Sequence, residues 1–338
     1  MSGHVIFTAQ EDAQRVALRE LKACVPDLTL IRLLAPGVGL VSLPGGFPVL
    51  AQALHAAPPV FVRHICPADA EVPLRGDSED LNRLKDAAKT LLPGFTGNAP
   101  VSVQTRALGA LPVYKRFDVN EALADILMGS GLTLDIRKPE RVLSVALEGD
   151  RAYLGVSDVR DNRSDWAGGC RRFAKEQARI SRAEFKLLEA LEVFDLALPE
   201  QGHAVDLGAA PGGWTHVLHE RGLRVTAVDP ANLDPRLAGL PGIEHRAVTA
   251  QVFFKNPVRC DLLVNDMKMD SDASAALMAE YASNLVEGGQ AVLTLKLPAE
   301  GWESRIRRAL QTLRAAYASV EARQLFHNRS EVTCALRR

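Results

Sequence analysis

The segment 203–214, His-Ala-Val-Asp-Leu-Gly-Ala-Ala-Pro-Gly-Gly-Trp, constrains the fold of this chain more than any other feature. Its apolar start has the length of a buried strand. The loop that follows contains a proline and three glycines, which let its backbone approach a ligand closely: Gly208, Pro211, Gly212 and Gly213. Residues 215–220 are typical of a helix start. A strand, a glycine-rich loop and a helix in this order predict an open α/β nucleotide-binding sheet.

The composition of the loop favours a nucleoside without phosphates. The loop is Gly-x-x-Pro-Gly-Gly and lacks the Lys-Ser/Thr pair of a phosphate-binding loop. Asp206, near the end of the strand, suits a cationic or amine-bearing ligand, and Asp229 ends the next expected strand, where it can accept from both ribose hydroxyls. A nucleoside with a positive charge and an amino group is S-adenosylmethionine. An unrelated glycine-rich strand–helix turn is the alternative interpretation.

Length and composition indicate a globular protein. The 338 residues allow two domains of ordinary size, with 47% hydrophobic and 24% charged residues. No apolar run reaches membrane-spanning length, and the first residues lack the pattern of a signal peptide. The five cysteines lie far apart without a Cys-x-x-Cys pair, so neither a zinc site nor a disulfide framework is indicated. We expect a cytoplasmic protein with no metal and no membrane partner; a monomer is favoured, although the sequence does not determine the oligomeric state.

The charge distribution indicates a nucleic-acid partner more clearly than the net charge of −1 does. Residues 160–186 contain eight basic and four acidic residues, and residues 302–338 contain eight arginines and three glutamates. Two basic stretches on either side of the sheet can follow a phosphate backbone, so RNA is the expected partner. Ordinary solvated arginines are the alternative interpretation.

The first half of the chain has the pattern of two small α+β regions. Residues 1–75 alternate as β-α-β-β-α-β, which predicts a ferredoxin-like unit. Residues 76–157 follow as helix, strand, helix and hairpin, and resemble a THUMP domain, an RNA-binding module, in the segments 101–106, 119–128, 133–139 and 142–156. A generic ferredoxin-like accessory unit is the alternative. Residues 158–178, polar and basic, are expected to be a linker.

Residues 179–338 have the alternating pattern of a Rossmann-like sheet. Ser181, with Glu184 three residues later, predicts a capped helix that ends near residue 194. The last two strands are joined by a short turn, so we expect an antiparallel last strand. The expected strands are 204–207, 224–228, 243–248, 261–265, 290–297, 319–325 and 331–336, and the expected helices are 215–221, 273–285 and 303–317.

Four charged side chains are expected to meet at the ligand-binding edge of this sheet. Asp266 and Lys296 lie at the carboxyl ends of parallel strands, and Glu331 begins the antiparallel strand at the same edge. Lys186 can reach this edge from the preceding helix. Lys296 is flanked by apolar residues, and burying it without a partner is costly, so a nearby carboxylate is expected. Each residue also has an ordinary interpretation, as a solvent-reaching lysine or a turn-forming aspartate.

Lys186, Asp266, Lys296 and Glu331 match in order the Lys-Asp-Lys-Glu tetrad of the FtsJ-like ribose 2′-O-methyltransferases. The strings 206–214, 265–267, 295–298 and 322–333 further resemble the RlmM family, which methylates a cytidine of 23S ribosomal RNA and carries an N-terminal THUMP domain. The resemblance covers about residues 160–338. It implies S-adenosylmethionine-dependent 2′-O-methylation of RNA, with Lys296 as the base and the two acids orienting the lysines.

The resemblance also implies a set of cofactor contacts. Gly208, Pro211, Gly212, Gly213 and Trp214 match the donor loop, Asp229 the ribose contact, and Ser181 a position near the methionine end; Asp206 and Asp266 complete the expected set. Thr249 stands where the family has an acidic residue near the adenine amine. The alternatives are a THUMP-containing base N-methyltransferase, although Asn265-Asp-Met-Lys replaces its Asp/Asn-Pro-Pro-Tyr string, and a non-catalytic RNA-binding protein.

Overall fold

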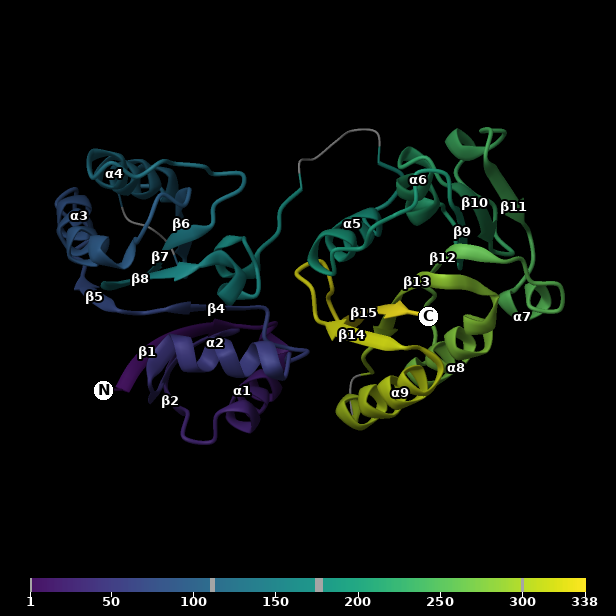
Figure 1. Ribbon diagram of the computed structural model, residues 1–338, viewed down its shortest axis with the longest axis horizontal. Helices are drawn as coiled ribbons and strands as arrows, with labels where there is room; N and C mark the ends of the chain where they lie inside the picture. The colour runs from purple at the N-terminus through teal and green to yellow at the C-terminus, as the bar shows by residue number, and fades with distance from the viewer. Residues whose placement is uncertain (1, 110–112, 174–178, 299–300) are drawn as a thin grey trace. The chain divides into compact units, whose positions relative to one another are not determined.

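The computed structural model describes residues 2–109, 113–173, 179–298 and 301–338 (Figure 1). The chain divides into two compact units, Met1–Cys170 and Arg171–Arg338. Together they confirm the expected α/β class, with sheet-containing α+β structure preceding a mostly parallel sheet. No helix within the described ranges is long and apolar enough to cross a membrane.

The N-terminal unit begins with a four-stranded antiparallel sheet of order β2-β3-β1-β4. Its strands and helices alternate as β-α-β-β-α-β, as the sequence predicts. The elements are β1 (Ser2–Thr8), α1 (Gln14–Cys24), β2 (Thr29–Ala35), β3 (Val38–Pro44), α2 (Gly46–Ala56) and β4 (His64–Pro67).

A second four-stranded sheet in the same unit has the order β5-β8-β7-β6. Its first strand, β5 (Ala70–Pro73), pairs with β8, so this sheet begins before residue 76, where we expected a boundary. Four residues that include Glu71 and Pro73 carry no strand-like alternation, which is why the sequence does not reveal β5. The remaining elements are α3 (Asp80–Leu91), β6 (Val101–Ala107), α4 (Arg116–Gly129), β7 (Arg141–Glu148) and β8 (Arg151–Asp158).

Part of the expected linker is packed onto the N-terminal unit. The guanidinium of Arg163 donates to the carbonyl oxygens of Pro59 and Val62, and the hydroxyl of Thr8 donates to the carbonyl oxygen of Gly168. These bonds attach the segment around residues 163–168 to the part of the unit that contains the first sheet, so this basic and glycine-containing segment is not a flexible linker. Residues 174–178 of the expected linker lie outside the described residues.

The C-terminal unit contains a seven-stranded sheet of order β11-β10-β9-β12-β13-β15-β14. All strands are parallel except β15, which runs antiparallel to both neighbours, and this confirms the expected antiparallel last strand. The strands are β9 (His203–Leu207), β10 (Arg224–Val228), β11 (Ile243–Arg246), β12 (Cys260–Asn265), β13 (Leu285–Lys296), β14 (Ser319–Arg323) and β15 (Glu331–Arg337). The helices are α5 (Glu184–Val193), α6 (Gly213–Glu220), α7 (Ala250–Phe253), α8 (Ser271–Tyr281) and α9 (Trp302–Ala316).

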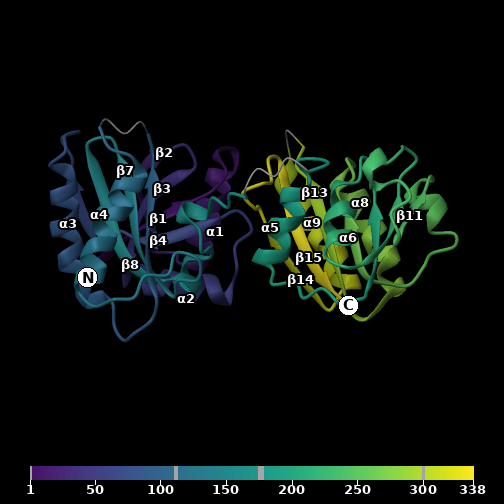
Figure 2. The same ribbon diagram turned by 90° about the horizontal axis from the view of Figure 1, so that it is seen from above.

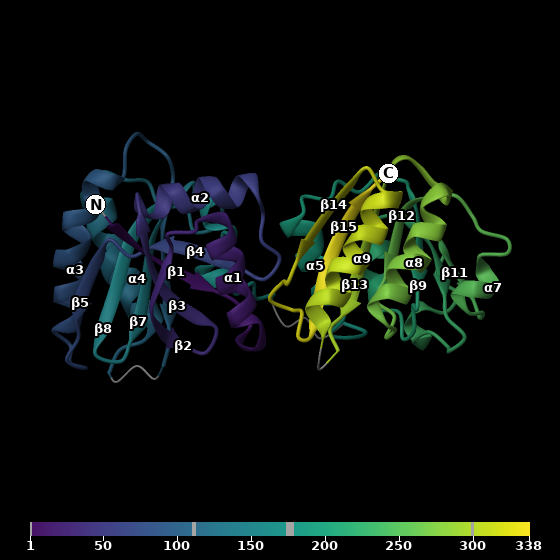
Figure 3. The same cartoon turned by 90° about the horizontal axis from the view of Figure 1, so that it is seen from below.

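Within this unit helices cover both faces of the sheet, with α5 and α6 on one face and α8 and α9 on the other (Figures 2 and 3). The strand order reverses between β9 and β12, and ligands of such sheets bind beyond the strand ends at this reversal. A buried apolar cluster packs α5 and α6 against the sheet; it includes Leu187, Leu218, Val264 and Val292. Strand β13 starts five residues earlier than expected because Gly288 and Gly289, a turn signal in sequence, are accommodated within the strand.

Candidate active site

Three neighbouring strands change from apolar to charged side chains at one edge of the sheet. Successive residues of a strand face opposite sides, so residues 262, 264 and 266 share a face, as do 292, 294 and 296, and 335, 333 and 331. Leu262, Val264, Val292 and Ala335 belong to the apolar cluster beneath α5 and α6. On this same face, a charged residue directly follows β12, another ends β13 and a third begins β15. The strand pattern therefore places Asp266, Lys296 and Glu331 under α5, which carries Lys186.

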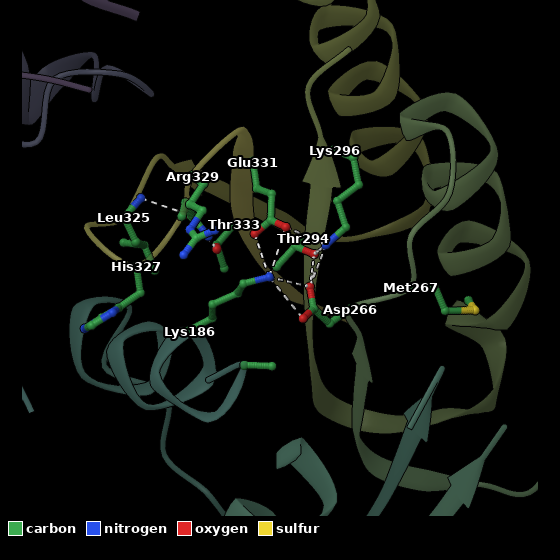
Figure 4. Close-up of polar contacts among 12 residues, drawn as sticks. Lys186, Asp266, Met267, Thr294, Lys296, Leu325, His327, Arg329, Glu331 and Thr333 are labelled. Carbon is green, nitrogen blue, oxygen red and sulfur yellow. Dashed lines mark hydrogen bonds and ion pairs between the residues drawn. The ribbon is translucent and has the colours of Figure 1, made fainter. Parts of the chain in front are cut away.

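The four charged side chains form a closed set of ion pairs (Figure 4). Lys186 Nζ lies 3.1 Å from Asp266 Oδ2 and 2.7 Å from Glu331 Oε2. Lys296 Nζ lies 2.7 Å from Asp266 Oδ1 and 2.8 Å from Glu331 Oε1. Lys296 and Glu331 are also direct partners in the β13–β15 pairing. Between 15% and 20% of each side chain is exposed, so the set is largely shielded but reachable. The structure thus brings together all four residues that the sequence singles out.

The charges of the set stabilise one another. Burial alone lowers the pKa of Lys186, but the carboxylates of Asp266 and Glu331 outweigh it and raise the pKa above its ordinary value. Burial raises the pKa of Asp266, and the ammonium groups of Lys296 and Lys186 more than offset this effect, so that pKa is lowered. Lys186 is therefore held as a cation and Asp266 as an anion at neutral pH.

The expected donor loop lies at the end of β9 and leads into α6. Gly212 precedes α6 with φ of 108°, a conformation that L side chains rarely adopt. A Cβ added at Gly208 would lie 2.2 Å from Met267 Cγ, and one at Gly213 would lie 2.2 Å from Ser181 Oγ. The loop is thus packed directly against the residue that follows Asp266 and against the turn before α5. This packing places the loop beside the charged set.

Asp206 and Trp214 support the loop from inside. The Asp206 side chain, 1% exposed, accepts a hydrogen bond of 2.7 Å from the hydroxyl of Thr215. Burial raises the pKa of Asp206 to about 7 although the bond from Thr215 opposes the rise. The indole N–H of Trp214 donates to the carbonyl oxygen of Ala183 at 2.8 Å, and only 3% of the residue is exposed. Both side chains hold the loop in shape, and Pro211 lies at its outer part.

The remaining expected contacts lie around the loop. Asp229 follows β10, and its carboxylate accepts from the backbone N–H groups of Ala210 and Ala231, which leaves acceptor capacity for two hydroxyls. Ser181 Oγ accepts from the N–H of Ala183, and α5 begins at Glu184 rather than directly after Ser181. Thr249 is exposed and caps the short helix α7 by accepting from an N–H at 3.3 Å.

None of the described His, Cys, Asp and Glu residues gather in threes that could hold a metal ion.

The chain is similar to known methyltransferases. A family model described as FtsJ-like methyltransferase matches residues 179–309. Ribosomal RNA large subunit methyltransferase M of Halorhodospira halophila is 40% identical over 204 residues, which cover 59% of this chain and 58% of that protein. The protein of the same name from Pseudomonas putida is 30% identical over 273 residues, covering 70% of this chain and 75% of that protein.

The chain belongs to the ribosomal RNA large subunit methyltransferase M family. This confirms the resemblance found in the sequence. The chain spans 58% of the length of the Halorhodospira member of the family. Among solved structures, TrmN from Thermus thermophilus is similar with 17% identity, a TM-score of 0.42 and coverage of 100% of both chains.

Three further residues of this family member support the site; the sequence did not indicate Thr294 and Glu189, and it indicated Glu184 only as a helix cap. Thr294 Oγ1 accepts from Lys296 Nζ at 2.8 Å and donates to Asp266 Oδ1. The buried carboxylate of Glu184 accepts from the N–H groups of residues 180 and 181, which shapes the turn that touches the loop. The buried carboxylate of Glu189 accepts from the N–H groups of Phe326 and His327, ahead of β15. A glutamate inside an apolar helix stripe is the signal that could have indicated Glu189.

Proposed function

We propose that this chain is an S-adenosylmethionine-dependent ribose 2′-O-methyltransferase of RNA that acts on a cytidine of 23S ribosomal RNA. The observation that carries the proposal is the meeting of two lysines and two carboxylates at the ligand-binding edge of the sheet. The FtsJ-like match over residues 179–309 supports methyl transfer. The names of the relatives support ribosomal RNA as the substrate, which would place the enzyme in the cytoplasm.

The donor loop and its surroundings fit S-adenosylmethionine, which supplies the methyl group when bound. Asp229 would hold the ribose hydroxyls, because each of its oxygens accepts one backbone N–H and keeps a free lone pair. The backbone of Gly208 and Gly212 would line the cofactor, because a residue without a Cβ lets a ligand approach its backbone closely. Ser181 would contact the methionine end, and Thr249, exposed at the start of α7, the adenine side.

The tetrad supplies a base and its electrostatic support. Lys296, after giving one proton to solvent, would take the proton of the ribose 2′-hydroxyl as the hydroxyl oxygen bonds to the methyl carbon and the bond from that carbon to sulfur breaks, which leaves S-adenosylhomocysteine. Asp266 and Glu331 hold the amine from two sides at 2.7 and 2.8 Å. Lys186 balances the charge of the two acids and stays protonated because they raise its pKa. Holding the hydroxyl in line supplies more of the rate than the base does, on the order of several kcal/mol.

The N-terminal unit is proposed to bind the RNA. Its second sheet contains the segments that resemble a THUMP domain, and β6, α4 and β7 form the strand–helix–strand crossover expected there. The basic stretch 302–338 in the C-terminal unit would add contacts to the phosphate backbone, while its Arg305 and Arg308 already pair with Asp270 and Asp272. A monomer is the proposed working form.

The test uses the full chain with 23S ribosomal RNA that lacks its own modifications. Lys296→Ala should reduce methyl transfer at least 1000-fold while S-adenosylhomocysteine binds within about threefold of wild type. The control is Lys255→Ala, which removes an exposed lysine of the same unit and should leave the rate unchanged. Undiminished transfer by Lys296→Ala would reject the assignment of the base.

Analysis of the product decides between methylation of the ribose and of the base. A methyl group on the base survives loss of the ribose in mass spectrometry, whereas a 2′-O-methyl group does not. Mapping of 2′-O-methyl positions in total RNA from cells with and without the gene should show one position that depends on it. A methylated base would indicate the N-methyltransferase instead, and no RNA methylation would indicate a binding protein.

A further inference from the structure

Thr294 connects two members of the charged set through one hydroxyl. It lies two residues before Lys296 on β13, so the two side chains leave the same face of the sheet. Its Oγ1 accepts from Lys296 Nζ at 2.8 Å and donates to Asp266 Oδ1. Thr294 is 1% exposed, so this hydroxyl is shielded from water. The contact is thus part of the buried floor of the site (Figure 4).

The hydrogen bonds of Lys296 show what this hydroxyl does. Before it gives up a proton to act as the base, Lys296 is an ammonium with three N–H donors, and its Nζ has three oxygen acceptors, in Asp266, Glu331 and Thr294, at 2.7, 2.8 and 2.8 Å. The two carboxylates also accept from Lys186, so they are shared between two amines. The third acceptor is neutral and closes a triangle of hydrogen bonds with Lys296 and Asp266. This triangle fixes the rotation of the amine and the position of the carboxylate together.

Resting on the proposed function, we propose that Thr294 is a positioning residue for methyl transfer. Its hydroxyl holds the amine of Lys296 and the carboxylate of Asp266 in the arrangement that receives the ribose proton. Without it, one N–H of Lys296 loses its acceptor in a buried position and Asp266 Oδ1 loses a donor. The amine can then turn away from the hydroxyl, and a displacement of about 1 Å costs on the order of 100-fold in rate.

The chain offers a matched control on the neighbouring strand. Thr333 is the direct partner of Thr294 in the β13–β15 pairing and is 0% exposed. Its hydroxyl donates to Asn328 Oδ1 at 2.9 Å. Replacing Thr333 by valine therefore removes an equally buried hydroxyl at the same level of the sheet, while the contacts of Thr294 stay in place.

The first experiment measures kcat and KM of the full chain for Thr294→Val, Thr294→Ser and Thr333→Val. We expect Thr294→Val to lower kcat about 10- to 100-fold, with KM for RNA and the Kd of S-adenosylhomocysteine changed less than threefold. Thr294→Ser, which keeps the hydroxyl, and Thr333→Val should stay within about threefold of wild type. The inference fails if Thr294→Val keeps its kcat, or if Thr333→Val loses as much.

The pH profile of kcat adds a readout that loss of stability does not move. The titratable groups facing Lys296 are Lys186 from α5, Asp266 after β12 and Glu331 from β15, and all are present in each variant. A displaced profile in Thr294→Val alone supports the inference. Superimposable profiles for all four proteins oppose it.

A second experiment needs no activity and separates this inference from the proposed function. In protein labelled with ¹⁵N-lysine, the Lys296 ammonium signal is assigned by its loss in Lys296→Ala, and its hydrogen exchange with water is measured. Exchange should be at least fivefold faster in Thr294→Val than in Thr333→Val. If the wild-type chain transfers no methyl group, the proposed function fails, and the exchange rates then test the role of Thr294 without it. Equal exchange rates in Thr294→Val and Thr333→Val would overturn the inference.

Discussion

At the scale of single residues, the site is a balanced group of buried charges. Two lysines and two acids share their contacts, and each lysine lies between both carboxylates. Breaking a buried ion pair by removing one partner typically costs about 3–5 kcal/mol, because the other charge stays uncompensated. The interpretation of any substitution in the set therefore requires a measurement of folding beside the measurement of rate.

Asp206 allows a test of how burial controls charge near the donor loop. Its pKa of about 7 in the folded protein lies above the ordinary value, so the folded state keeps a proton that the unfolded state has lost. This contribution to stability is complete below about pH 4 and is lost as the pH rises to about 7, a decrease of roughly 3–5 kcal/mol. The side chain at position 206 does not titrate in the Asp206→Asn variant. The free energy of unfolding of this variant, relative to that of wild type, should therefore rise between about pH 4 and pH 7.

Urea unfolding of the ligand-free proteins between pH 4 and pH 8 measures this difference. The two stability curves should converge or cross as the pH increases. Curves that run parallel over the whole interval would contradict the raised pKa of Asp206.

At the scale of elements, the sequence predicts the strands that form the site because each is a clear apolar run followed by a charged residue. The ends of β12 and β13 and the start of β15 follow from this pattern, and the single antiparallel strand follows from the short turn between residues 326 and 330. Such runs are reliable signals because parallel strands buried on both faces are almost continuously hydrophobic. The meeting of Asp266, Lys296 and Glu331 was therefore predictable.

Other features could not be predicted because their causes are tertiary. Thr294 lies in an apolar strand, and nothing in Leu-Thr-Leu-Lys indicates that its hydroxyl meets Asp266. Strand β5 and helix α7 have four residues each, too few for a periodic pattern. Asp206 was expected to suit a ligand, but its side chain faces inward onto Thr215. Burial and partner choice depend on packing that a single sequence does not display.

The contact between the donor loop and the turn before α5 leads to a prediction about cofactor affinity. In Gly213→Ala the added Cβ would lie 2.2 Å from Ser181 Oγ and 3.2 Å from Glu184 Cγ, so the turn must move. We expect the Kd of S-adenosylhomocysteine to rise about tenfold, equivalent to about 1.4 kcal/mol, as measured by isothermal titration calorimetry. Gly129→Ala, where nothing lies within 4 Å of the added Cβ, is the matched control. Unchanged affinity in Gly213→Ala would show that the turn does not contribute to cofactor binding.

At the scale of the whole molecule, the chain consists of two compact units with separate cores. The donor loop and the charged set lie entirely in Arg171–Arg338, whereas the two four-stranded sheets belong to the N-terminal unit. Proteins of this construction commonly depart from two-state unfolding. Cofactor binding and folding stability should therefore be coupled in one unit and not in the other.

Differential scanning calorimetry of the full chain tests this coupling. S-adenosylhomocysteine at 100 times its Kd should stabilise the C-terminal unit by about 2.7 kcal/mol and shift its transition upward. The transition of the N-terminal unit should keep its temperature. A ligand-induced shift of the entire heat-capacity profile would show instead that the two units unfold as one.

The pairing of Lys296 with Glu331 across β13 and β15 restricts which changes of chain length the last strand can tolerate. Neighbouring side chains of a strand point to opposite faces, so inserting or deleting an odd number of residues moves the side chains that follow to the other face. Deleting a single residue just after Glu331 would have one of two effects. Either Glu331 would face the layer of α8 and α9, or the side chains of the rest of β15 would move to the opposite face of the sheet. Members of this family should therefore vary in the outward-facing side chains of this strand while keeping its residue count.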